Sequence, residues 1–150
     1  MDNRESKTEF DKFVDQLQEE IYQQELKDYN ERIVELFHDP PNWGKLPDGE
    51  NVYSIGYRGP CGDLMQFFLE IENDTIKQAK FITDGCGASV AAGSQTTLMI
   101  DGKSIDSAAK LTPKDVDNAL DGLPADHKHC AELTIRTLKR LIKKYKNNKE

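Results

Sequence analysis

The sequence lacks a long hydrophobic run, since no apolar stretch approaches the roughly 18 residues that a membrane-spanning helix needs. We expect no signal peptide either, because a strongly charged stretch follows Met1. A basic excess is missing as well: 20 Lys and Arg stand against 27 Asp and Glu, for a formal net charge of −7. Proteins that bind nucleic acids normally carry a basic surface. These absences exclude membranes and nucleic acids as expected partners and predict a soluble, cytoplasmic protein.

Cysteine is scarce, and the three that occur are Cys61, Cys86 and Cys130. An odd number cannot pair completely within the chain, and the expected cytosolic environment is reducing, so a disulfide scaffold is excluded. With 150 residues, the chain has the length of one domain that buries a core without such cross-links. Each cysteine is therefore a buried apolar thiol, a catalytic thiol or a metal ligand.

The first 38 residues predict one long helix. Apolar residues recur at steps of three to five positions from Phe10 to Phe37, with charged residues between them. Such a helix would be roughly 43 Å long, which exceeds the diameter of a small domain, so we expect a break near residues 27–30 or a projecting end. Asp39-Pro40-Pro41 ends the pattern, because proline lacks an N–H donor and disfavours helix in the residue before it.

Three segments of alternating hydrophobicity predict β-strands, and their short connections predict an antiparallel meander. The chain after them has helical periodicity. We therefore expect an α+β fold: a three-stranded antiparallel sheet packed with helices on one side, plus a long N-terminal helical extension. The expected strands cover residues 52–57, 64–72 and 76–83; the expected helices cover 88–102, 104–110, 112–120 and 127–145; the expected units are an extension of residues 1–34 and a domain of residues 35–150.

Charge is distributed unevenly between the two ends of the chain. Residues 1–31 hold four Lys and Arg against ten Asp and Glu, a net charge of −6, whereas residues 131–150 hold seven against two, a net charge of +5. One interpretation is that both runs are solvated helix faces. The other is that the two ends attract each other or recruit a partner.

The sequence around each cysteine argues against three core thiols. Cys61 lies in the turn sequence GPCGD, Cys86 lies between glycines in TDGCGAS, and Cys130 follows His129 at the expected start of the last helix. Glycines let the backbone approach a bulky ligand and leave N–H groups that donate to sulfur. Helix N-termini favour the thiolate, which is the form that binds metals and attacks sulfur. We expect Cys130 to be both activated and able to reach outward.

Two further side chains complete a set of ligands. Asp63 follows Cys61 by two residues, and His129 is adjacent to Cys130, so each offers an oxygen or nitrogen donor beside a thiolate. Three thiolates with one such donor suit zinc or an iron–sulfur cluster. The other two histidines, His38 and His127, are interpreted as solvated or capping residues.

Five motifs together resemble the iron–sulfur cluster assembly scaffolds of the IscU/NifU type. The resemblance implies that Cys61, Asp63, Cys86 and Cys130 bind the cluster or metal, that Cys130 accepts sulfane sulfur from a cysteine desulfurase, and that His129 is an alternative ligand. The motifs follow the family order and cover about residues 35–145: DPPNWG (39–44), GPCGD (59–63), TDGCGAS with AAGS (83–94), DGKS (101–104) and LP…HC (123–130).

The chain departs from the family pattern in three places. Pro41 stands where the family often has arginine, and the run LPPVK is replaced by Leu123-Pro124-Ala125-Asp126-His127. The acidic segment before about Asp28 is longer than is usual. We interpret it as a site of homodimerisation or partner docking, or as a helix packed on the body.

The resemblance implies a scaffold, not an enzyme. A [2Fe–2S] cluster would be built from iron and desulfurase-derived sulfur, with electrons from a donor such as ferredoxin, and passed to acceptor apo-proteins. The alternative is a zinc-bound, SufU-like protein that accepts persulfide, although the 43 residues between Cys86 and Cys130 are few for the insertion of that branch. A cysteine hydrolase using Cys61 or Cys130 with His129 is disfavoured, because adjacent helical residues point about 100° apart.

Overall fold

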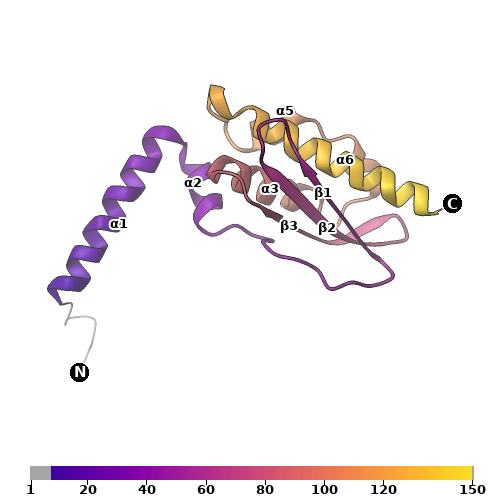
Figure 1. Ribbon diagram of the computed structural model, residues 1–150, viewed down its shortest axis with the longest axis horizontal. Helices are drawn as coiled ribbons and strands as arrows, with labels where there is room; N and C mark the ends of the chain where they lie inside the picture. Colours follow the sequence, from indigo (N-terminus) through magenta and orange to yellow (C-terminus); the bar gives the residue numbers. More distant parts are fainter. Residues whose placement is uncertain (1–7, 150) are drawn as a thin grey trace.

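The structure is a computed structural model that describes residues 8–149. A three-stranded sheet carries helices on one face, and one further helix projects away from this body (Figure 1). Within the described residues, no helix combines the length and apolar character needed to cross a membrane. The elements are α1 (Glu9–Asp28), α2 (Glu31–His38), β1 (Val52–Arg58), β2 (Leu64–Glu72), β3 (Thr75–Thr83), α3 (Gly87–Ile100), α4 (Ile105–Ala109), α5 (Pro113–Ala119), the 3-10 turn η2 (Ala125–His127) and α6 (His129–Lys149).

The sheet is an antiparallel meander in the order β1-β2-β3, as the alternating segments predict. Asn73 and Asp74 form the hairpin turn between β2 and β3, and both have positive φ angles, which matches the twist of a two-residue turn. The central strand β2 presents four buried side chains to the helical side at alternate positions. They are Met65, Phe67, Leu69 and Ile71.

Helix α3 lies unusually close to the sheet because its residues are small. A Cβ atom added to Gly93 would lie only 2.5 Å from the ring of Phe81, so only glycine allows this approach. Helix α6 covers β1 and the rest of the same face, with Leu138 and Leu141 fully buried. The predicted arrangement of a sheet with helices on one side is therefore confirmed.

The N-terminal helical pattern is interrupted between α1 and α2. Tyr29 is extended, and Asn30 caps α2 by accepting from the N–H of Ile33 at 2.9 Å. The side-chain amide of Asn30 also donates to the carbonyl of Leu120 at 2.8 Å, which anchors α2 to the body. A break near residues 27–30 and a projecting end are thus both found.

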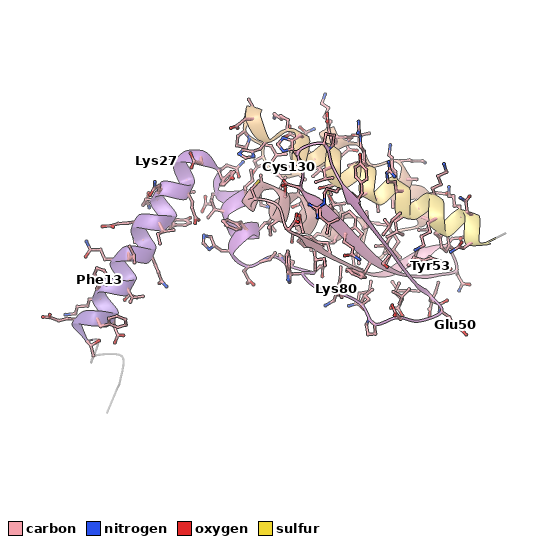
Figure 2. All side chains as sticks on the ribbon, viewed as in Figure 1. Phe13, Lys27, Glu50, Tyr53, Lys80 and Cys130 are labelled. Atoms are coloured by element: carbon pink, nitrogen blue, oxygen red, sulfur yellow. The ribbon has the colours of Figure 1, made fainter. Side chains whose placement is uncertain are left out.

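The two N-terminal helices differ in burial. Helix α1 has no buried residue, and Phe13, labelled far from the body in Figure 2, keeps 61% of its surface exposed. Helix α2 buries Ile33, Val34 and Leu36. The expected division after residue 34 therefore falls inside a helix that packs into the core.

The loop after α2 extends the sheet by a short parallel bridge. The N–H of Gly44 donates to the carbonyl of Phe81 at 2.8 Å, and the N–H of Phe81 donates to the carbonyl of Asn42 at 3.1 Å. The last helix begins at His129, two residues later than expected, because residues 125–127 form a separate 3-10 turn. That turn decides where His127 points.

Candidate metal centre

The three cysteines are far apart in sequence and meet at one place in the fold. Cys61 lies in the turn between β1 and β2, and Cys86 is the N-cap of α3. Cys130, labelled in Figure 2, is in the first turn of α6. Cys61 and Cys86 are exposed, whereas Cys130 is buried. The centre therefore combines two thiols that face solvent with one that faces the core.

Two groups of metal-binding atoms lie next to each other, and within each group all atoms are within 4.8 Å of one another. Every ligand expected from the sequence belongs to one of them. His127 belongs as well, although from the sequence we interpret it as a solvated or capping residue. The first group is Cys61, Asp63 and His129, and the second is Cys86, His127 and Cys130.

His38 behaves as the sequence predicts. Its side chain is 52% exposed, and its ring pairs with the carboxylate of Glu25, which lies on α1. It belongs to neither group of metal-binding atoms.

The turn that carries Cys61 is held at both ends. The N–H of Gly59 donates to the carbonyl of Asp63 at 2.9 Å, and the guanidinium of Arg58 donates to the carbonyl of Gly62. Asp84 accepts from the N–H of Leu64 at 2.7 Å, and this hydrogen bond lowers the pKa of its carboxyl. These hydrogen bonds close the Cys61 turn and tie its end at Leu64 to Asp84, which directly follows β3.

Ser89 connects the ligands of the two groups. Its hydroxyl lies 3.4 Å from Asp63 Oδ2, 3.4 Å from Cys130 Sγ and 3.9 Å from Cys86 Sγ, and the residue is fully buried. A Cβ on Gly85 would lie 2.7 Å from this hydroxyl, so the glycine leaves room for the contacts. Sequence reasoning missed Ser89, although its position three residues after Cys86 places it on the same helical face.

The thiols of Cys86 and Cys130 differ strongly in acidity. The hydrogen bond from Cys130, together with the N–H groups of Ser89 and Ala88 at the start of α3, lowers the pKa of Cys86 to about 4. The same hydrogen bond and burial raise the pKa of Cys130. The expectation that Cys130 is activated and reaches outward is therefore wrong for this structure. The start of a helix favours a thiolate only where the sulfur points at the free backbone N–H groups. The sulfur of Cys130 points into the core instead.

Aromatic rings pack beside the second group of ligands, where Tyr29 lies just before α2. The rings of Tyr29 and His127 are 5.5 Å apart, and the rings of His127 and His129 are 6.2 Å apart. Burial and the neighbouring thiol of Cys86 raise the pKa of Tyr29 to about 12. The phenol therefore stays neutral beside the thiolate at physiological pH.

The first group opens to solvent through a groove. Besides Cys61 and His129, the groove is lined by Tyr57, Pro60, Leu133 and Arg136. Thiolate and imidazole donors suit zinc, iron and iron–sulfur clusters, and the carboxylate of Asp63 adds one harder donor. The donor set thus fits a thiolate-rich metal centre with an accessible side.

Comparison with known proteins places most of the chain in one family. The family model for the NifU-like N terminal domain matches residues 28–150. The chain is 38% identical over 123 residues to the protein named iron-sulfur cluster assembly scaffold protein IscU 1 of Archaeoglobus fulgidus, covering 81% of this chain and 80% of that one. It is 41% identical over 120 residues to the IscU scaffold protein of Aquifex aeolicus, covering 79% and 76%.

A solved structure supports the fold. It is a putative iron-sulfur cluster assembly scaffold protein for the SUF system from Fervidobacterium islandicum, with a TM-score of 0.62 and 22% identity, covering 78% of this chain and 98% of that one. The matched family region includes both groups of metal-binding atoms and leaves most of α1 outside. The resemblance stated from the motifs is confirmed, and the chain belongs to the IscU/NifU family.

Proposed function

We propose that the chain is a scaffold on which an iron–sulfur cluster is assembled and from which it is passed to acceptor proteins. The observation that carries the proposal is the convergence of three thiols with a carboxylate and imidazoles from separate motifs. Relatives that are 38% and 41% identical to it over the aligned 123 and 120 residues are named as assembly scaffolds. A cluster that is handed on is cargo, so the protein is not an enzyme.

The proposed cargo is a [2Fe–2S] cluster. Its irons are bound by Cys61, Asp63, Cys86 and Cys130, with His129 as an alternative ligand. A carboxylate is a hard donor and holds iron less strongly than a thiolate does. Asp63 is therefore the proposed point at which the cluster leaves.

Sulfur is proposed to arrive as a persulfide from a cysteine desulfurase. Cys130 is buried in the free chain, so this step requires the desulfurase complex to expose it. The Cys130 thiolate formed there attacks the outer sulfur of that persulfide, the desulfurase thiolate leaves, and a persulfide remains on Cys130. Two electrons from a donor such as ferredoxin then cleave the S–S bond, which releases sulfide and restores the thiolate. Cys86 competes for this role, because it is exposed and has the lowered pKa.

The second candidate function is persulfide transfer by a zinc-bound, SufU-like protein. This candidate is considered because a solved structure with the same fold is described as a protein for the SUF system. The higher sequence identity to IscU proteins favours the cluster scaffold.

Anaerobic purification with metal analysis separates the two functions. A cluster scaffold gives visible sulfide-to-iron absorption bands, with iron and acid-labile sulfide in equal amounts after reconstitution. A colourless protein that holds one zinc tightly and refuses iron and sulfide would contradict the proposal.

A further inference from the structure

The centre has more donors than one four-coordinate ion uses, because two complete groups of three lie next to each other. We propose, building on the scaffold function, that divalent metal binds at two adjacent positions and that His127 is a ligand at one of them. The inner position is formed by Cys86, His127 and Cys130, and the outer position by Cys61, Asp63 and His129.

The spacing of the inner donors fits a metal ion. Zn–S and Zn–N bonds of about 2.3 and about 2.0 Å put sulfur and nitrogen about 3.5 Å apart at a tetrahedral centre. His127 Nδ1 lies 3.8 Å from Cys86 Sγ, so this pair needs a shift of only a few tenths of an ångström, and all three donor atoms lie within 4.8 Å of one another. The ring needs no new rotamer to reach the metal.

The far side of the His127 ring faces a carboxylate. Its Nε2 lies 3.9 Å from Oδ1 of Asp126, an ion-pair distance that is longer than a hydrogen bond. Histidines that bind metals usually donate their second ring N–H to such a group, which fixes the ring orientation. The ring also contacts Tyr29, and its side chain is only 27% exposed. With the ring packed in this way, Nδ1 faces Cys86.

The two positions share a boundary at Cys130. Its Sγ lies 3.8 Å from His129 Nε2, the same separation as between Cys86 and His127. Ser89 adds a second link, since its hydroxyl contacts both Cys130 and Asp63 at 3.4 Å. A thiolate at Cys130 is thus placed to bridge two ions.

This geometry suggests what the segment that replaces LPPVK contributes to the centre. His127 stands at the end of the segment that replaces LPPVK, where the family run ends in lysine. A lysine is protonated at neutral pH and has no free lone pair, whereas a neutral imidazole binds borderline divalent ions such as Fe²⁺, Zn²⁺ and Co²⁺. The replacement adds a ligand at the inner position.

Anaerobic titration of the full chain with Co²⁺, followed by absorption spectroscopy, tests the inference. Wild type should bind two ions per chain, both with thiolate-to-cobalt charge-transfer bands. His127→Gln should weaken the inner ion at least tenfold and leave the outer one, while His129→Gln should do the opposite. His38→Gln is the matched control, since His38 is exposed and remote from both positions, and it should bind two ions normally. His127→Cys should restore the inner ion.

A single Co²⁺ per wild-type chain would overturn the two positions, whichever histidine it depends on. Two ions with unchanged affinity in His127→Gln would overturn the role of His127. Circular dichroism of the metal-free variants checks that each is folded, and the restored binding in His127→Cys separates ligation from folding. Two-ion binding by a chain that never assembles a cluster would contradict the scaffold function alone.

Discussion

The hydroxyl of Ser89 lies 3.4 Å from the thiol of Cys130, and this contact joins the starts of α3 and α6. The same hydroxyl reaches Asp63 at 3.4 Å, so one buried side chain touches ligands from two distant motifs. Ser89 binds no metal in the proposed sets, yet its hydroxyl links a ligand of the first group to a ligand of the second.

We predict that Ser89→Ala weakens metal binding about 10- to 100-fold, because groups that orient metal ligands contribute on that scale. The lost hydrogen bonds should also lower the free energy of unfolding by about 1 kcal/mol. Zinc competition and urea unfolding of the metal-free protein measure the two effects. Ser94→Ala is the control, since Ser94 is also buried on α3 but donates to the carbonyl of Pro41 at 2.7 Å. Equal losses of metal affinity in both variants would contradict a specific role for Ser89.

The lowered pKa of Cys86 predicts an unusual pH profile for its alkylation. A thiol with a pKa near 8.5 reacts nearly two orders of magnitude faster at pH 8 than at pH 6, because its thiolate fraction rises with pH. Cys86 has a pKa of about 4, so it is already a thiolate at pH 6, and its rate should change less than about twofold. Iodoacetamide labelling of the metal-free protein with peptide mass spectrometry measures the rate at Cys86.

The variant Cys130→Ala tests why the alkylation rate of Cys86 is expected to change so little with pH. It removes the hydrogen bond that contributes most to the lowered pKa of Cys86, so labelling at pH 6 should become slower. An unchanged rate would assign the effect to the backbone N–H groups of α3 alone.

We predict that the N-terminal boundary of the scaffold domain lies between α1 and α2. A chain beginning at Tyr29 should keep its free energy of unfolding within about 1 kcal/mol of the full chain, because no residue of α1 is buried and the His38 partner of its Glu25 is 52% exposed. A chain beginning at Glu35 loses Ile33 and Val34 from the core, and each such loss costs about 2 kcal/mol or more. Urea unfolding of both chains decides between them. Equal stability of the two would support a boundary at residue 34.

The location of transferred sulfur tests the persulfide proposal. If Cys130 is the acceptor, Cys130→Ser should abolish most transfer from a matched desulfurase, whereas Cys61→Ser should not. Because Cys130 is buried, we expect transfer only when the desulfurase complex exposes it. Mass spectrometry that finds the sulfane sulfur mainly on Cys86 would reassign the acceptor to the exposed, more acidic thiol.

Most residues of this centre could be predicted from the sequence, because their immediate neighbours in the chain already distinguish them. Glycines around Cys61 and Cys86 and the helix start at Cys130 are read from neighbouring residues alone, and they are the signals from which a shared thiol site is predicted. The alternation of β2 likewise predicts a strand with one buried face, and its buried residues confirm this.

The features that were missed depend on contacts between distant segments. His127 has no local signal, because a 3-10 turn carries its ring toward Cys86, 41 positions earlier in the chain. Ser89 stands in a run of small residues that indicates only close packing. The burial of Cys130 depends on how α6 packs on the sheet, which its own neighbours do not specify.

Cluster transfer measures the central claim most directly. The full chain, loaded anaerobically from iron, cysteine and a desulfurase, is mixed with an apo-ferredoxin, and the cluster is followed on both proteins. The scaffold function predicts equal iron and sulfide on the chain, then loss from the chain matched by gain on the ferredoxin. Asp63→Ala should load but transfer more slowly and keep its cluster longer in air, because a weak ligand is gone and His129 lies within the same group. A wild-type chain that never holds sulfide, or an Asp63→Ala chain that loses its cluster faster in both assays, would contradict the account.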